Sequence, residues 1–332
     1  MALCGGSHDP STIVDTGDRI SPMRFADQLL DAIDRYRAPC VVALDPVFKN
    51  LPDELTRPHG PDPDFAAQLQ CIEAFAGRVI ECIAGIVPAV KINSAYFEAY
   101  GAAGVACYYR LLHRTKAAGL VTIGDVKRGD VGHTAEMYAR AHLSDAALAD
   151  AQTQAMPDAI TISGYFGSDG ASPFIDIAKQ EGRGIFVLVR TSNKSAAAIQ
   201  DVVTGDGRKV HEIVAGEVAR WASESDTTGR HGYSSVGAVV ATRNATDATR
   251  LRQAMPQSIF LVPGYGAQGG RAEDFLPYFD ANGKGAIIAA GRSVIFAYAD
   301  AAMRAGCSGD WQACVRKSCQ DFVADIRRAA RL

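Results

Sequence analysis

The sequence predicts an α/β protein built as a (β/α)8 barrel, or TIM barrel, with an extra N-terminal helix and a C-terminal helical region. Eight short apolar segments, each typical of a buried strand, alternate with segments of helical periodicity along the 332 residues. This alternation indicates a parallel sheet, and eight units in a chain of this length favour a closed barrel over an open doubly wound sheet. Because no internal repeat or low-complexity linker indicates a second domain, we expect one barrel domain over residues 21–332 and a flexible leader over residues 1–20.

The first helix is predicted from its start signal and its periodicity. Ser21 and Pro22 have the form of an N-cap followed by proline in the first helical turn. Apolar residues then recur at helical spacing from Phe25 to Tyr36, which predicts a helix over residues 22–37. This helix precedes the first strand and therefore stands outside the eightfold alternation.

The eight strands and their helices follow in order. Strands are expected at residues 40–44, 87–93, 120–123, 158–162, 184–189, 236–241, 259–262 and 286–289. Helices are expected at residues 64–84, 95–117, 133–151, 172–180, 209–224, 247–255 and 272–279, with a terminal helical region from about residue 300. Two connections are long: residues 46–63 are rich in proline, and residues 190–208 form either an active-site lid or a disordered segment.

Charged residues stand where the third strand is predicted to end. Asp125 and Lys127 follow the apolar run at residues 120–123, and side chains two apart on a strand share a face. An unpaired buried charge is costly, so these two must pair with each other, with a ligand or with further charges. Asp130 lies beyond the strand end, where this spacing rule no longer applies, and can face elsewhere, including a neighbouring subunit. The alternative is a structural ion pair with Asp130 at the start of a helix.

Two further charges stand near the ends of the first two strands. Asp45 follows the first strand, and Lys91 lies near the end of the second. Either could be structural, since an aspartate before proline can cap a loop and a terminal lysine can reach solvent. In a barrel, however, the ends of all three strands meet at the carboxyl-terminal face, where barrel enzymes keep their catalytic residues. The sequence therefore predicts an active site that contains Asp45, Lys91, Asp125 and Lys127.

Glycine-rich segments follow the last two strands. Residues 263–270 read Pro-Gly-Tyr-Gly-Ala-Gln-Gly-Gly, and residues 291–293 read Gly-Arg-Ser. Barrels often bind phosphate with these two loops, because glycine lets backbone N–H groups approach an anion. Arg292 adds a planar guanidinium that matches phosphate oxygens. The alternatives are tight turns for the glycines and a surface salt bridge for Arg292, but the paired loops favour a phosphate site.

Composition and charge exclude several classes of partner. The formal net charge of −3 provides no basic field for nucleic acid and no polybasic membrane patch. No apolar run reaches membrane-spanning length, and residues 1–20 lack the pattern of a signal peptide. The eight cysteines include no CxxC pair, which suits reduced thiols. We therefore expect a soluble cytoplasmic protein that binds neither nucleic acid nor membranes.

The motifs resemble those of the orotidine 5′-monophosphate decarboxylase family, in its longer bacterial subgroup (type 2). The segment Asp125-x-Lys127-x-x-Asp130 followed by Thr134 is similar to that family's signature. The chain also contains, in the family's order, Ala-Leu-Asp-Pro, Val-Lys-Ile-Asn, Arg-Thr-Ser-Asn, Pro-Gly-x-Gly-Ala-Gln-Gly-Gly and Gly-Arg-Ser. The resemblance thus spans the predicted barrel.

This resemblance implies decarboxylation of orotidine 5′-monophosphate to uridine 5′-monophosphate in de novo pyrimidine biosynthesis, without cofactor or metal, by a homodimer with shared active sites. Lys127 would donate the proton to C6, within a charge array that Lys91, Asp125 and Asp130 complete. Asp130 and Thr134 would reach across the dimer interface. The implied substrate-binding residues are Asp45 and Thr134 for the ribose, Ser192 for the pyrimidine, and Gln268 and Arg292 for the phosphate, together with Gly264 and Gly291.

Two alternatives remain open. The first is a related Mg²⁺-dependent sugar-phosphate decarboxylase or synthase, which shares the Asp-x-Lys-x-x-Asp pattern. Those relatives place an acidic residue where this chain has Lys91, and an ammonium there would oppose a divalent metal. The second is an inactive barrel that serves as a homodimeric binding module. It requires that a catalytic residue be missing, and none is missing.

Overall fold

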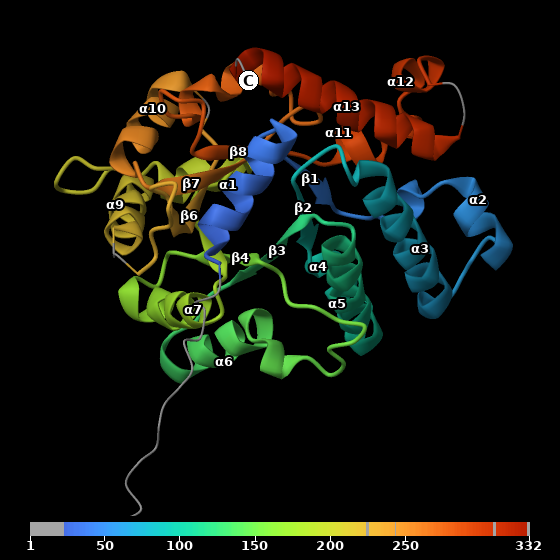
Figure 1. The fold of residues 1–332 in the computed structure, drawn as a ribbon, viewed down its shortest axis with the longest axis horizontal. Helices are drawn as coiled ribbons and strands as arrows, with labels where there is room; N and C mark the ends of the chain where they lie inside the picture. The colour runs from blue at the N-terminus through green and yellow to red at the C-terminus, as the bar shows by residue number, and fades with distance from the viewer. Residues whose placement is uncertain (1–22, 224–225, 243, 308–309, 331–332) are drawn as a thin grey trace, which may run out of the picture.

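The computed structural model describes residues 23–223, 226–242, 244–307 and 310–330. Eight parallel strands close into a barrel in which each strand pairs with the next along the chain and the last pairs with the first (Figure 1). The strands are β1 (Cys40–Leu44), β2 (Ala89–Asn93), β3 (Val121–Arg128), β4 (Ala159–Ser163), β5 (Gly184–Arg190), β6 (Ser234–Val240), β7 (Ser258–Pro263) and β8 (Ala286–Ala290). The predicted barrel class is confirmed.

Helical segments surround the barrel. Those that alternate with strands are α3 (Phe65–Ile83), α5 (Gly101–Ala117), α6 (Gly132–Leu143), α7 (Ser168–Gln180), α9 (Val210–Ala222), α10 (Ala245–Ala254) and the 3-10 helix η5 (Ala272–Tyr278). Short helices are α2 (Asp53–Thr56), α4 (Ala95–Glu98), α8 (Ala197–Gln200), α11 (Arg292–Ile295) and α12 (Ala301–Ala305), and 3-10 turns are η1 (Phe48–Asn50), η2 (Arg57–His59), η3 (Asp145–Ala147), η4 (Lys194–Ala196) and η6 (Ala297–Ala299). Helix α1 (Phe25–Tyr36) precedes the barrel, and α13 (Trp311–Ala330) packs on its outside against α3 (Figure 1).

The strands divide the buried apolar residues into two layers. Inward-pointing side chains, among them Val41, Ile123, Phe186 and Leu261, fill the interior of the barrel. The alternate residues point outward and pack against the surrounding helices. This period of two leaves both faces of each strand apolar, as expected of a parallel sheet covered by helices. Charged inward-pointing residues occur toward the carboxyl-terminal ends of the strands, which is where the site forms.

Helix α1 closes the amino-terminal end of the barrel. Its buried face belongs to the same apolar cluster as the barrel interior. The ring of Phe25 meets that of Phe186 edge-on, with 5.7 Å between centroids. A Cβ at position 184 would lie only 2.1 Å from the Phe25 ring, so Gly184 is required for this contact. The helix predicted over residues 22–37 is confirmed in its described part, while its predicted cap and the predicted leader lie outside the described residues.

Several predicted boundaries differ from the structure by a few residues, such as the start of α7 at Ser168 instead of residue 172, and two differ most. Strand β3 continues to Arg128 instead of ending at residue 123, because it pairs with β4 again beyond an irregularity that begins after Gly124. Helix α6 ends at Leu143 instead of residue 151. Near that predicted end, the Asp150 carboxylate accepts hydrogen bonds from a backbone N–H and a hydroxyl two and three residues further on, and such local turns compete with helix.

The two long connections contain short helices that the sequence did not indicate. Residues 46–63 include η1, α2 and η2, and residues 190–208 include η4 and α8. No disulfide forms among the seven cysteines of the described part. Within the same part of the chain, no helix is both long and apolar enough to cross a membrane.

Candidate active site

The carboxyl-terminal ends of the strands surround a cavity of about 300 Å³. Apolar side chains of the barrel interior, such as Val239 and Leu261, line part of its wall. The predicted site residues that also line it are Asp45, Lys91, Asp125, Lys127, Ser192, Gly264, Gln268, Gly291 and Arg292. The fold therefore brings together residues that are spread over some 250 positions of the sequence, about the length of a typical barrel.

Four charged residues form a connected array where β1, β2 and β3 end. Lys91 Nζ lies 2.6 Å from Asp125 Oδ2 and 3.7 Å from Asp45 Oδ1. Lys127 Nζ lies 2.6 Å from the other Asp125 oxygen, Oδ1. Asp125 is therefore held between two ammonium groups. Negative and positive charges alternate from Asp45 through Lys91 and Asp125 to Lys127.

Pairing outweighs burial in this array and keeps its buried members charged. Burial raises the pKa of the Asp125 carboxyl, but Lys91 and Lys127 together hold that pKa well below its ordinary value. Burial likewise lowers the pKa of the Lys91 ammonium, but Asp125 and Asp45 outweigh it and raise that pKa above its ordinary value. The Lys127 side chain is 48% exposed, against 11% for Lys91 and 8% for Asp125. A molecule in the cavity therefore reaches Lys127 more readily than its two partners.

Lys127 owes its position to the irregularity in β3. Strands β3 and β4 stay in register up to Gly124 and resume their pairing at Arg128. Between these points Lys127 has a φ of 44°, in the left-handed region that residues other than glycine rarely adopt. The shared face of Asp125 and Lys127 was predicted from regular strand spacing, but in the structure a bulged backbone places the two side chains together.

Two loops meet at the β7 and β8 side of the cavity. These are the β7 loop (residues 264–270) and the β8 loop (residues 291–293). Gly264 and Gly266 have φ angles of 126° and 67°, which favour glycine. A Cβ on Gly266 would lie 2.7 Å from the Ser293 hydroxyl, so glycine lets the loops touch. Arg292 is exposed at this junction and lines the cavity, which places a guanidinium beside a glycine-rich backbone, as anion binding requires.

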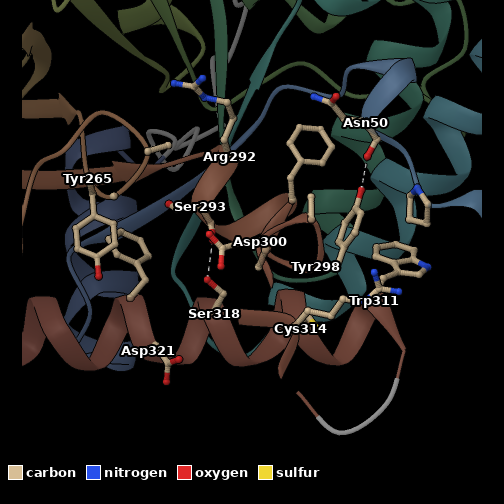
Figure 2. A pocket seen from close by; sticks show the side chains of 18 of the residues that line it. Asn50, Tyr265, Arg292, Ser293, Tyr298, Asp300, Trp311, Cys314, Ser318 and Asp321 are labelled. Atoms are coloured by element: carbon tan, nitrogen blue, oxygen red, sulfur yellow. Dashed lines mark hydrogen bonds between the residues drawn. The ribbon is translucent and has the colours of Figure 1, made fainter. Parts of the chain in front are cut away.

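Helix α13 contacts both loops, and in Figure 2 it runs below Tyr265 and Ser293. The Ser318 hydroxyl donates a hydrogen bond to the backbone carbonyl of Ser293 at 2.7 Å. The Tyr265 hydroxyl donates one to Asp325 at 2.8 Å, and its ring lies 4.5 Å, centroid to centroid, from that of Phe322. These contacts border a wider hollow of about 1440 Å³ between the loops and α13. The loops are therefore held by a helix that comes from the end of the chain.

Ser192 lies in the connection after β5, whose residues form hydrogen bonds with one another. The Gln200 amide accepts the Thr191 N–H at 2.9 Å and donates to the Thr191 hydroxyl at 2.8 Å. Arg190 donates two hydrogen bonds of 3.0 Å to the Asp201 carboxylate. Of the two predictions for this connection, disorder is therefore wrong for its first half, while a role as a lid stays a prediction.

Asp130 and Thr134 do not line the cavity of their own chain. The half-buried Asp130 carboxylate accepts a hydrogen bond from the backbone N–H of Val131 at 2.8 Å, and Thr134 is exposed on α6. Large apolar side chains are exposed close by: Val131, Met137 and Tyr138 lie within four residues of Thr134, and Phe166, whose ring contacts that of Tyr165, lies beside Gly129. The sequence predicted a catalytic array of four residues. Within one chain, the structure brings together three of them, Lys91, Asp125 and Lys127.

The residues that line the cavity but were not predicted as site residues include the polar side chains of Asn93, Tyr96 and Thr161. Asn93 stands two residues after Lys91 and therefore shares its inward face. Thr161 stands two residues after the inward-pointing Ala159. Following the inward positions to the end of each strand would have found both, whereas Tyr96 comes from α4 and no strand pattern indicates it.

Known proteins match this chain over most of its length. Residues 41–305 match the model of the family described as orotidine 5′-phosphate decarboxylase / HUMPS. An orotidine 5′-phosphate decarboxylase of Rhodopirellula baltica is 39% identical over 282 residues, which cover 83% of this chain and 89% of that protein. One of Clostridium tetani is 41% identical over 224 residues, covering 68% and 74%. The solved structure of Leishmania donovani OMP decarboxylase matches with a TM-score of 0.69 at 26% identity, covering 93% of this chain and 100% of the other.

Proposed function

Because the chain belongs to the orotidine 5′-phosphate decarboxylase / HUMPS family, we infer that it decarboxylates orotidine 5′-monophosphate to uridine 5′-monophosphate in pyrimidine biosynthesis. We propose that Lys127 donates the proton to C6 and that the reaction needs no cofactor. The observation that carries this proposal is the Asp125 carboxylate, which lies 2.6 Å from each of two ammonium groups at the cavity wall.

The chemistry requires a cation at the reacting carbon. When the bond between C6 and the carboxylate breaks, CO₂ leaves and the electron pair stays on C6. A fixed ammonium stabilises this negative charge and then transfers a proton to it, which gives uridine 5′-monophosphate. Lys127 suits this role because its side chain is the more exposed of the two lysine side chains that pair with Asp125. The reaction leaves Lys127 neutral, and a proton from solvent restores it.

The other members of the array keep Lys127 in place. Asp125 accepts a hydrogen bond from the Lys127 ammonium. It would stand beside the departing carboxylate of the substrate. Lys91 is less exposed than Lys127 and pairs with both Asp125 and Asp45. Since breaking a buried ion pair leaves an uncompensated charge, each member stabilises the position of the next.

The remaining site residues would bind the rest of the nucleotide. Ser192 would contact the pyrimidine and Asp45 the ribose, both from the cavity wall. The β7 and β8 loops would bind the phosphate, through Gln268, Arg292 and backbone N–H groups at Gly264 and Gly291. The phosphate lies far from C6, but the binding energy that it provides can be used to lower the barrier at the reacting carbon.

We propose a homodimer in which Asp130 and Thr134 of one subunit complete the cavity of the other. Two observations support this arrangement. Both residues lie outside the cavity of their own chain, and exposed apolar side chains such as Val131 and Phe166 lie near them. Large exposed apolar patches are typical of protein interfaces. A single domain over residues 21–332 and a cytoplasmic location belong to the same proposal.

The Mg²⁺-dependent sugar-phosphate reaction is the second candidate, because enzymes of that group share the Asp-x-Lys-x-x-Asp pattern of residues 125–130. A divalent cation is bound mainly by carboxylates and other oxygen ligands. Here the Lys91 ammonium lies between the carboxylates of Asp45 and Asp125, which disfavours a cation at the same point. An inactive binding module is disfavoured because Lys91, Asp125 and Lys127 are all present and paired.

The test is a direct assay with purified protein. Orotidine 5′-monophosphate is followed by its absorbance in the presence of a chelator. Rapid loss of the substrate signal is the expected result. A rate that appears only when Mg²⁺ is added in excess of the chelator would favour the second candidate, and no turnover under either condition would favour the binding module.

A further inference from the structure

One buried hydroxyl connects the backbone of Lys127 to the side chain of Asp125. Thr161 on β4 is 1% exposed. Its Oγ1 accepts a hydrogen bond from the Lys127 N–H at 2.9 Å and donates one to Asp125 Oδ1 at 2.8 Å. A threonine hydroxyl carries one proton and two lone pairs, so here it acts both as a donor and as an acceptor. The same Asp125 oxygen also accepts the Lys127 ammonium.

The position of Thr161 in the sheet explains why this hydroxyl is needed. Gly124 pairs with Ile160, and Arg128 pairs with Ile162. Three residues of β3 therefore stand opposite Thr161 alone, so regular ladder pairing is lost over this stretch. A backbone N–H that loses its ladder partner in a buried place needs another acceptor. The Thr161 hydroxyl provides that acceptor for Lys127.

The bond also holds a strained backbone. Lys127 is one of two non-glycine residues with positive φ in the described part of the chain, and the other, Arg37, ends helix α1. Such conformations persist when the surroundings determine them. Here the residue in question carries the ammonium that pairs with Asp125. Fixing its N–H therefore fixes the point from which its side chain starts.

We propose that Thr161 is a positioning residue for the decarboxylation, which sets the backbone of Lys127 and the carboxylate of Asp125 relative to each other through one hydroxyl. The inference rests on the function proposed above. Thr161 acts on the reaction through these two residues rather than on the substrate. Its removal lets Lys127 leave the left-handed conformation and lets Asp125 rotate, and a displacement of about 1 Å at a reacting group can cost on the order of 100-fold in rate.

The experiment compares Thr161→Val with Thr161→Ser. Valine keeps the shape of threonine and removes the hydroxyl, whereas serine keeps the hydroxyl. We expect Thr161→Val to lower kcat by about 10- to 100-fold with KM changed less than about threefold, because the chemical step loses its geometry while the nucleotide grip stays intact. Thr161→Ser is expected to retain most of the wild-type kcat.

Thr122 provides a matched control at the other end of the barrel. It is a fully buried threonine on β3 whose hydroxyl donates to Asp158 Oδ2 at 2.8 Å and accepts the Asp158 N–H at 3.0 Å. Thr122→Val removes the same kind of bridge, so it should lower the melting temperature about as much as Thr161→Val. It should leave kcat unchanged, because Thr122 does not line the cavity.

Several results would overturn the inference. These are a wild-type kcat in Thr161→Val, an equal loss in Thr122→Val, or a loss that Thr161→Ser does not restore. If Thr161→Val does not fold, Thr161→Ala replaces it, and a wild-type kcat in that variant has the same meaning. Absence of turnover in the wild-type protein would instead contradict the proposed function, so the two failures are distinguishable.

Discussion

The charged side chains where β1, β2 and β3 end pair with one another around a buried centre, whereas the β7 and β8 loops lie near the solvent and contact α13. Lys91 and Asp125 are 11% and 8% exposed and lie 2.6 Å apart. Arg292 is exposed, and its loop is held from behind by the bond between Ser318 and Ser293. The first region is an array in which each charge depends on its neighbour, and the second is a pair of loops supported through their backbone.

This difference predicts how each region responds to substitution. A change in the charge array should affect both the chemical step and the folded state, because the same ion pairs serve both. A change in the two loops should affect affinity for the phosphate and leave the folded state nearly as stable as before. The four predictions that follow test this contrast, from the largest expected effect to the smallest.

Lys127→Ala should give the largest loss of activity. We expect kcat to fall by on the order of 10²- to 10⁴-fold, the range of general acid catalysis, because Lys91 lies behind Asp125 and cannot replace the missing ammonium. The measurement is the loss of substrate absorbance at saturating concentration, with circular dichroism to verify folding. A loss of less than about 100-fold would remove Lys127 from the role of proton donor.

Asp125→Asn should destabilise the protein far more than Arg292→Ala. The first variant leaves Asp45, 3.7 Å away, as the remaining ion-pair partner of the buried Lys91 ammonium among the described residues, and breaking a buried ion pair costs about 3 kcal/mol. The second changes an exposed side chain, which typically costs within about 0.5 kcal/mol. Urea unfolding of both variants measures the difference. Equal free energies of unfolding would mean that the two regions do not differ in this way.

Arg292→Ala should act on affinity for the phosphate. We expect KM for orotidine 5′-monophosphate to rise by about 10- to 100-fold, which corresponds to the loss of one or two charge-assisted hydrogen bonds. Turnover of orotidine, the nucleoside without phosphate, should be nearly unchanged, and that substrate is the internal control. Equal losses on both substrates would show that Arg292 acts through the structure of the β8 loop instead of through the phosphate.

The last prediction tests whether the charge array contains residues of two chains, whereas the β7 and β8 loops at each site come from one chain. Inactive Lys127→Ala and inactive Asp130→Ala dimers are dissociated, mixed and allowed to re-form. About half of the dimers should be mixed, each with one intact site of two, so activity should recover to about a quarter of wild type. A matched mixture of Lys127→Ala with Asp125→Asn should recover nothing. Asp125 and Lys127 of one chain contribute to the same cavity, so each of the two sites in a mixed dimer still lacks one of them.

The mixing experiment has a clear negative outcome. If subunit exchange is verified with labelled chains and the first mixture also stays inactive, then Asp130 acts within its own chain. The exposed apolar side chains near it, such as Tyr165, would then need another explanation.

Local patterns in the sequence were sufficient to predict the barrel and most of the cavity. Short apolar segments indicate which stretches of the chain are buried on both faces. This pattern can be recognised from neighbouring residues in the sequence alone. The closed barrel then places the ends of all strands on one face, so Asp45, Lys91 and Arg292 could be assigned to one site from their order in the chain. Their positions in the structure agree with that assignment.

Contacts between distant residues decided the rest. The two-residue spacing of Asp125 and Lys127 does not reveal that β3 bulges between Gly124 and Arg128, because the bulge is defined by pairing with β4. The role of Thr161 depends on that pairing, and the support of Tyr265 depends on α13, some 60 residues further along the chain. Periodicity describes the burial of a segment, whereas hydrogen bonds such as these form only when the closed barrel brings the partners together.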